Sequence, residues 1–196
     1  MILVFDLDDT IVDTDGYSEK YISRFIKENN LPYKLVNKVA RFAEKKFNWD
    51  METALRWYKE YGDDMMLEFP CREKAKEVLD ELYEAGHKII IATARANDWH
   101  KDPEGVTKKW LEKNNIRYHK LYVGRVDKEK ICEEEHADVF LDDDVNITKR
   151  VAEYFKSVGN GKSCLFVTDY NSTLDVSEDV IRIKSFVDFY EMINKK

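Results

Sequence analysis

Ile2-Leu3-Val4-Phe5-Asp6-Leu7-Asp8-Asp9-Thr10 is the stretch around which the chain is organised. Its apolar start, Ile2 to Phe5, predicts a strand buried on both faces, as in a parallel sheet. Acids follow at once, and carboxylates at the end of a buried strand repel each other and lose hydration unless a counter-ion is near. If strand geometry persists, Asp6 and Asp8 point the same way. The stretch predicts a cation site; the alternative is a polar turn in which Asp9 or Thr10 caps a helix.

The composition is that of an acidic globular protein. The 196 residues have room for one domain and a substantial insert. Hydrophobic residues make up 43% and aromatic residues 13% of the chain, which excludes a disordered protein. The net charge of −7 argues against nucleic acid as a partner, because that partner needs a basic surface. A small anionic substrate remains compatible, since local charge can oppose the global balance.

Nothing in the sequence points to a membrane or to a disulfide framework. The apolar runs are too short to span a bilayer, and the first strand leaves no place for a signal peptide. Cys71, Cys132 and Cys164 are widely separated and show no CxxC spacing, so we expect packed thiols and a reducing, cytoplasmic setting. The histidines lack a zinc-ligand spacing and are interpreted as structural or surface groups.

Helical periodicity follows Thr10. Tyr17 to Ile26 predicts one helix, Leu35 to Phe47 a second, and Asp50 caps a third that we expect Gly62 to stop. No stretch between Val12 and Pro70 has the pattern of a strand. We therefore expect a small helical insert, residues 13–69, packed above the first strand, and a second unit formed by residues 1–12 and 70–196.

The remainder of the chain alternates between strands and helices. The predicted strands are His87–Thr93, Lys120–Val123, Val139–Leu141, Ser163–Val167 and Val180–Ile183. This alternation predicts an α/β fold with a parallel sheet and right-handed crossovers, in which ligands sit at the carboxyl ends of the strands. Three strands end in residues that could bind a cation or take part in catalysis: Asp6-x-Asp8, Thr93 and Asp142-Asp143.

Asp6, Asp142 and Asp143 could offer oxygen ligands to one cation. Mg²⁺ suits this set, because it uses few protein carboxylates, keeps several waters and bridges to phosphate. The sequence does not decide which of Asp142 and Asp143 binds the metal directly.

The same strand ends could transfer a phosphoryl group. Asp6 could attack phosphorus to form an aspartyl-phosphate, and Asp8 could protonate the leaving oxygen and then take a proton from water. Thr10 could orient Asp8. Thr93 and the turn amides after it, beginning with Ala94, could bind phosphoryl oxygens. A lysine is expected to balance the charge of the phosphate and to hold Asp6. Lys128 is preferred for this role; the alternatives are that Lys130 fills it or that Lys128 is a solvated surface lysine.

These residues resemble the haloacid dehalogenase-like hydrolase superfamily. Asp6-Leu7-Asp8-Asp9-Thr10 matches its DxDxT motif, Ile91-Ala92-Thr93 its second motif, Lys128 its third and Asp142-Asp143 its fourth. The resemblance implies a Rossmann-like three-layer α/β/α sheet with the first strand in the middle, and a C1-type cap at 13–69. It also implies phosphatase chemistry, with metal held by Asp6, the Asp8 carbonyl and the fourth motif.

A finer resemblance concerns the substrate. Residues 87–147 are similar to the 5′(3′)-deoxyribonucleotidases and related bacterial and phage nucleotidases, through Thr93-Ala94-Arg95, Thr107–Leu111 and Ala137–Asp143. This resemblance implies a 5′-nucleotidase acting on (deoxy)nucleoside monophosphates. Arg95 could contact substrate phosphate or form a structural ion pair. Trp49 and Trp57 could stack on a base or form the cap's own core, and Trp99 and His100 could border the pocket.

Other functions remain open at this point. The enzyme could act on another small metabolite such as a sugar phosphate, or the chain could be an inactive binding member of the same fold. A receiver-like signalling domain also uses aspartate, threonine, lysine and Mg²⁺, but the order of motifs and the large insert argue against it. The leading hypothesis is a Mg²⁺-dependent phosphomonoester hydrolase.

Overall fold

The computed structural model describes residues 1–14 and 17–195. Six parallel strands form one sheet in the order β3-β2-β1-β4-β5-β6. The strands are β1 (Ile2–Phe5), β2 (Lys88–Thr93), β3 (Lys120–Val123), β4 (Val139–Asp142), β5 (Lys162–Phe166) and β6 (Val180–Ile183). The strand that carries the acidic motif is therefore interior to the sheet, and the α/β fold predicted from the sequence is confirmed.

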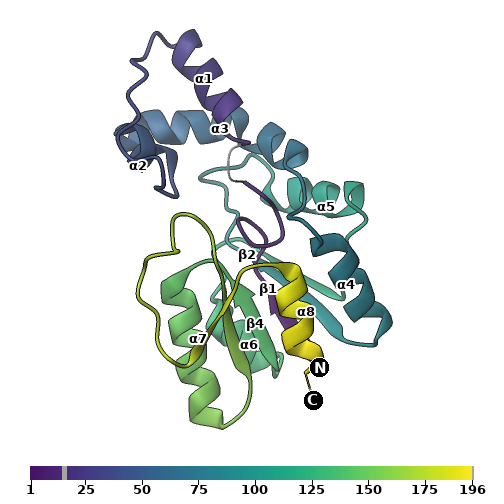
Figure 1. Cartoon of the computed structure of the whole chain (residues 1–196). Coiled ribbons are helices and arrows are strands. Elements are labelled where there is room, and N and C mark those ends of the chain that lie inside the picture. Colours follow the sequence, from purple (N-terminus) through teal and green to yellow (C-terminus); the bar gives the residue numbers. More distant parts are fainter. Residues whose placement is uncertain (15–16, 196) are drawn as a thin grey trace.

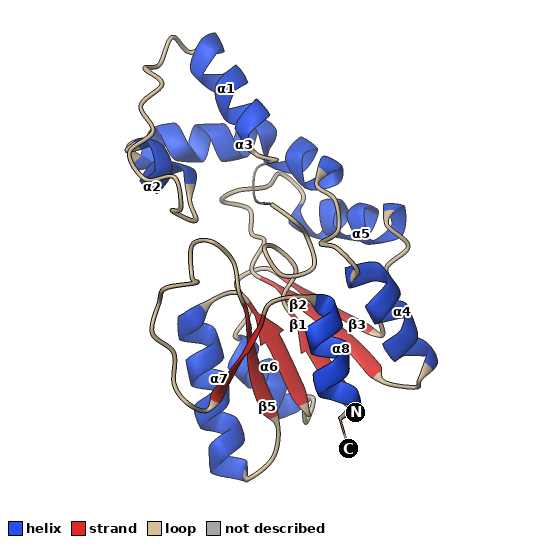
Figure 2. Cartoon of the chain, in the orientation of Figure 1, coloured by secondary structure: helices blue, strands red, loops and turns tan. Residues whose placement is uncertain are grey.

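Helices cover both faces of the sheet (Figures 1 and 2). The helices of this part are α4 (Ala75–Glu84), α5 (Pro103–Lys113), α6 (Lys128–Glu134), α7 (Val145–Val158) and α8 (Phe186–Asn194). Because alternate strand residues point to opposite faces, Leu3 and Phe5 pack with α4, α5 and α8, whereas Val4 packs with α6 and α7. The result is the expected three-layer arrangement.

The segment between β1 and α4 is helical and lies above the carboxyl edge of the sheet (Figure 1). Its helices are α1 (Glu19–Glu28), α2 (Ala43–Phe47) and α3 (Met51–Glu68), and together with their loops they are called the insert below. The two segments that connect the insert to the sheet run side by side. Val12 forms an antiparallel β-bridge with Cys71, and the Asp13 N–H donates to the Pro70 carbonyl at 2.9 Å.

Two predictions for the insert were wrong in detail. The second helix contains only Ala43–Phe47, and Leu35, Val36 and Val39 lie exposed in the loop before it. The third helix does not stop at Gly62 but continues to Glu68. A Cβ at Gly62 would lie 2.5 Å from the Trp99 carbonyl oxygen, so this glycine permits a close contact with the loop after β2.

Candidate active site

Neighbouring strand ends bring three acids together. The Asp6 N–H donates to the Leu141 carbonyl at 2.9 Å, which continues the β1–β4 pairing by one step and sets Asp6 beside Asp142. Asp6, Asp142 and Asp143 each offer a carboxylate oxygen within 4.8 Å of the others, and all three are buried. The parallel topology thus produces the acidic cluster that the sequence predicted.

Lys128 is the lysine that reaches this cluster. Asp127 caps α6, so Lys128 lies in its first turn, 4% exposed. Its Nζ lies 2.5 Å from Asp6 Oδ1 and 2.7 Å from Asp142 Oδ2. Lys130 is exposed and pairs with Glu134 at 3.6 Å. The structure therefore brings Lys128 to the acids and keeps Lys130 away from them.

The cluster needs more positive charge than Lys128 supplies. Burial raises the pKa of Asp6 to about 6 in spite of Lys128, with Asp142 and Asp8 adding to the rise. Burial also raises the pKa of Asp143 well above its ordinary value. A divalent cation bound by these hard oxygen donors would offset the mutual repulsion and keep Asp6 ionised. The residues present fit Mg²⁺.

Asp8 is clamped by an arginine. Arg95 donates from Nε to Asp8 Oδ2 at 2.8 Å and from Nη2 to Oδ1 at 2.6 Å, and its Nη1 donates to Thr107 Oγ1 at 3.2 Å. Burial by itself raises the pKa of Asp8, but the Arg95 charge and hydrogen bonds outweigh it and the pKa is lowered. Of the two roles considered for Arg95, the structure shows the ion pair.

Two expectations around Asp8 have different outcomes. The Thr93 hydroxyl lies beside it, 3.5 Å from Oδ2, and also accepts from the Arg95 N–H at 3.4 Å, and Ala94 lines the pocket next to it. The hydrogen bond expected from Thr10 to Asp8 is not present: within the described part of the chain, the buried Thr10 hydroxyl has no hydrogen-bond partner. Arg95 orients Asp8 instead, because a partly buried carboxylate gains more from a bidentate cation than from a hydroxyl.

Arg41, which sequence reasoning missed, extends from the insert toward the acids. Its Nη2 lies 3.0 Å from Asp143 Oδ2 and its Nη1 3.0 Å from Asp144 Oδ2. The guanidinium also packs over the Tyr170 ring at 5.2 Å. Arg41 lies in the stretch from Leu35 to Phe47 that was expected to be one helix, but it precedes the helix in the structure. Nothing in the local sequence pattern indicated its contacts with the acids, which arise from the tertiary fold.

Tyr170 and Asn171, in the loop after β5, support the fourth motif. The Tyr170 hydroxyl donates to Asp143 Oδ2 at 2.5 Å, and Asn171 Nδ2 donates to the Asp143 carbonyl at 2.8 Å. Asp144 caps α7 through the N–H groups of Asn146 and Ile147. The loop thereby fixes the direction of the Asp143 carboxylate.

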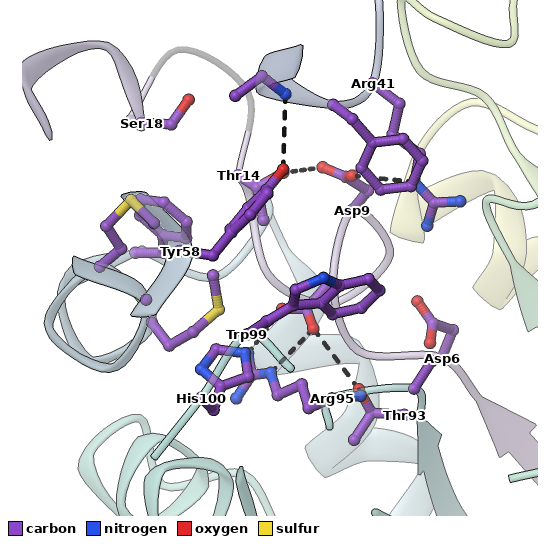
Figure 3. Close-up of a pocket in the computed structure, with 18 of the residues that line it drawn as sticks. Asp6, Asp9, Thr14, Ser18, Arg41, Tyr58, Thr93, Arg95, Trp99 and His100 are labelled. Atoms are coloured by element: carbon purple, nitrogen blue, oxygen red, sulfur yellow. Dashed lines mark hydrogen bonds and ion pairs between the residues drawn. The ribbon is translucent and has the colours of Figure 1, made fainter. Parts of the chain in front are cut away.

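A pocket of about 310 Å³ opens between the insert and the acids (Figure 3). Asp6, Asp8, Thr93 and Lys128 line its floor. The two tryptophans considered as base platforms differ in position. Trp57 lines the pocket but is 2% exposed and packs against Tyr58, whereas Trp49 packs inside the insert against Phe25, Phe47 and Trp57. Trp49 does not belong to the pocket wall. Trp99 and His100, from the loop after β2, do line it.

The fold and the site together define an α/β protein with an acidic centre at the carboxyl edge of its sheet. Residues 3–108, more than half of the chain, match the family model of haloacid dehalogenase-like hydrolases, and the chain belongs to this family. No curated protein matches the sequence.

Solved structures agree with this fold. A haloacid dehalogenase-like hydrolase from Streptococcus pneumoniae is 13% identical with a TM-score of 0.66, and 98% of each chain is covered. YfnB from Bacillus subtilis, bound to magnesium, is 12% identical with a TM-score of 0.66, covering 99% of this chain and 98% of that one. CbbY from Rhodobacter sphaeroides, with xylulose-1,5-bisphosphate, is 14% identical with a TM-score of 0.62 and 94% of each chain covered. At such identities the likeness shows the fold, and none of the three supports the finer resemblance to nucleotidases.

No helix in the described ranges combines the length and the apolar character that crossing a bilayer requires.

Proposed function

We propose that this hydrolase cleaves small phosphate monoesters with Mg²⁺ and an aspartyl-phosphate intermediate on Asp6. The observation that carries the proposal is the contact of Lys128 with both Asp6 and Asp142 at the floor of a pocket, with Asp143 completing a set of three oxygen donors. Bound Mg²⁺ would neutralise the acids and orient a phosphoryl oxygen. Asp6, Asp142, Asp143 and the Asp8 carbonyl would hold it.

The chemistry of this chain's own residues follows from that arrangement. A carboxylate oxygen of Asp6 forms a bond to phosphorus while the bond to the leaving oxygen breaks, and Asp8 gives that oxygen a proton. Water then attacks phosphorus, Asp8 takes its proton, and the bond from phosphorus to Asp6 breaks. Thr93, Ala94 and Lys128 would bind the phosphoryl oxygens.

Arg95 favours the second of these steps, because it holds Asp8 as a carboxylate. The first step needs a proton on Asp8. An incoming phosphate brings negative charge close to Asp8, which raises the affinity of the carboxylate for that proton.

Nucleoside monophosphates are the substrates that we propose within this class. The similarity of residues 87–147 to nucleotidases and the aromatic side chains of the pocket support them. A sugar phosphate is the second candidate, since CbbY, which shares the fold, is described with xylulose-1,5-bisphosphate. We also propose that residues 13–69 act as a cap that moves on its paired linkers; YfnB is described as showing interdomain movement. Free thiols at all three cysteines are in keeping with a cytoplasmic setting.

The test is a phosphate-release assay on purified protein with nucleoside monophosphates, triphosphates and sugar phosphates. Turnover should need Mg²⁺ and stop in EDTA, and Asp6→Asn should abolish it while the fold stays intact. Lys128→Ala and Lys130→Ala form a matched pair on one helix, of which only the first should lose activity. Full turnover in EDTA, or in Asp6→Asn free of contaminating phosphatase, would refute the mechanism. If the wild-type protein bound these esters but released no phosphate, it would instead be a catalytically inactive binding protein of the same fold.

A further inference from the structure

The pocket has two chemically different ends. The sheet provides the acids and the phosphate-binding groups, whereas the insert provides an apolar wall together with four polar side chains, Thr14, Ser18, Arg41 and Lys46. On α3 that wall is a stripe of side chains at helical spacing, continued by residues from α1 and from the segment after α3: Tyr58, Met65, Met66, Ile22 and Phe69. If phosphate sits at the acids, the rest of the ester must lie against this apolar wall.

The pocket has no surplus of positive charge for a second phosphate. Among the described lining residues, five carboxylates face four lysine or arginine side chains. Arg41, Arg95 and Lys128 are each in ion pairs with acids of the site, and Lys46 is the fourth. A divalent cation adds two positive charges, and one phosphate at neutral pH brings nearly two negative charges. Within the described lining, a second phosphate would find only Lys46 to pair with, one positive charge against nearly two negative charges.

The loop after β2 is fastened to α3 at Gly62 and Asp63. The close approach of the Trp99 carbonyl requires glycine at position 62. Next to it, His100 Nδ1 lies 3.0 Å from Asp63 Oδ1, and the His100 side chain is buried. This contact between an insert helix and a sheet loop determines where the backbone of Trp99 lies.

Trp99 is consequently held as a wall of the pocket while its ring stays partly exposed. It faces Tyr58 with ring centroids 6.1 Å apart, which is too close for a third ring between them. In the view of Figure 3, the indole lies between Tyr58 and Asp6. A flat group attached to phosphate at Asp6 would therefore lie against Trp99. Trp57 is almost fully buried and packs against Tyr58, so little of its ring is available to contact a ligand.

We propose that the pocket selects singly phosphorylated esters with an aromatic or apolar leaving group, and that Trp99 is the specificity-determining side chain it contacts. This inference rests on the proposed function, because it places the phosphate at Asp6. It goes further by assigning the platform to the sheet loop rather than to the insert tryptophans, and by excluding bisphosphates.

The first arm compares wild-type kcat/KM for three esters of primary alcohols, so that leaving-group basicity is similar. Benzyl phosphate should exceed glucose 6-phosphate by tenfold or more, and fructose 1,6-bisphosphate should be the poorest. A preference for either sugar ester would overturn the inference while leaving the phosphatase function in place.

The second arm compares Trp99→Ala, Trp99→Phe and the control Tyr33→Ala, an exposed insert aromatic outside the pocket lining. Trp99→Ala should lower kcat/KM for benzyl phosphate at least tenfold and for glucose 6-phosphate less than threefold, and Trp99→Phe should recover most of the loss. Equal losses for both esters would overturn the assignment of Trp99.

A third arm separates the inference from the proposed function. Binding of benzylphosphonate, which cannot be hydrolysed at its carbon–phosphorus bond, is measured by calorimetry with Mg²⁺ present. The wild type should bind it at least tenfold more tightly than Trp99→Ala does. If no ester were turned over, the phosphatase proposal would fail, but the binding measurement would still test whether Trp99 contacts the ligand. Equal affinity of the wild type and Trp99→Ala would refute that role.

Discussion

At the scale of single residues, three carboxylates of the site each have a different cationic partner. Lys128 holds Asp6, Arg95 holds Asp8 and Arg41 holds Asp143. The partner determines what each acid can do. Asp6 has a pKa raised to about 6 by burial, so a bound metal ion would further favour its ionised, nucleophilic form, whereas Asp8 is held ionised by Arg95.

Replacing Arg95 should therefore change the pH dependence of turnover as well as its rate. Without the guanidinium the pKa of Asp8 rises, so Asp8 becomes ionised, and able to accept a proton from water, only at higher pH. We expect Arg95→Met to lower kcat at pH 7 about tenfold or more and to move the acidic limb of the kcat–pH profile upward. Arg95→Lys should restore part of both. An unchanged acidic limb in Arg95→Met would show that Arg95 does not act through Asp8.

At the scale of elements, two contacts hold separate pieces of structure in place. On one edge of the sheet, Glu135 at the end of α6 accepts from Lys88 on β2 at 2.8 Å, from Tyr122 on β3 at 2.5 Å and from Lys120. At the other contact, Gly62 of α3 packs on the backbone of Trp99. Each contact joins elements that the site requires.

Glu135→Gln should destabilise the protein in a pH-dependent way. Hydrogen bonds from Lys120, Lys88 and Tyr122 lower the pKa of Glu135 to about 2. A carboxyl with a lowered folded-state pKa stabilises the fold above its unfolded pKa, near 4.3, and loses that contribution as pH falls toward 2. Urea unfolding should show a difference of about 1–2 kcal/mol at pH 7 that shrinks below pH 4. A difference that stays constant to pH 3 would contradict this account.

Gly62→Ala should destabilise the protein although alanine favours helices. The helix gains about 1 kcal/mol from the substitution, but the new Cβ would lie 2.5 Å from a backbone oxygen, and such overpacking costs about 1–3 kcal/mol. We expect a net loss of about 1 kcal/mol in thermal or urea unfolding, with weaker benzylphosphonate binding as Trp99 shifts. Glu60→Ala, at an exposed position of the same helix, is the control. A more stable Gly62→Ala would mean that the contact with Trp99 is loose.

At the scale of the whole molecule, the insert and the sheet meet around the acidic cluster. Arg41 of the insert pairs with Asp143 and Asp144 of the sheet unit, and its guanidinium would compete with a metal ion for Asp143. Binding of a metal ion and the position of the insert would therefore be coupled through one side chain.

Mg²⁺ should stabilise the folded protein, since it binds the assembled cluster and not the unfolded chain. At one hundred times its Kd the gain is about 2.7 kcal/mol, which corresponds to a rise in Tm of roughly 5–10 °C for a chain of this size. Arg41→Met should bind Mg²⁺ at least threefold more tightly by calorimetry, because a competing cation has been removed. Arg24→Met, which removes an exposed insert arginine paired with Glu28, should leave the affinity unchanged. Weaker binding in Arg41→Met would show that Arg41 supports the metal site instead of competing for it.

The sequence alone determined the α/β fold and the identity of the acidic cluster, because those depend on local patterns. Short apolar runs define buried parallel strands, and parallel strands bring their carboxyl ends to one edge. These strand ends were therefore enough to predict that Asp6, Asp142 and Asp143 lie together, whereas the choice between Lys128 and Lys130 was left to the tertiary structure. Only the tertiary structure decided the rest. Arg41 reaches the pocket from a segment whose local pattern carries no sign of it, the position of Trp99 against Tyr58 is set by the fold, and the length of α3 depends on what packs at Gly62. Contacts between segments distant in sequence depend on shape and charge across the whole fold, and these side chains obtain their roles from such contacts.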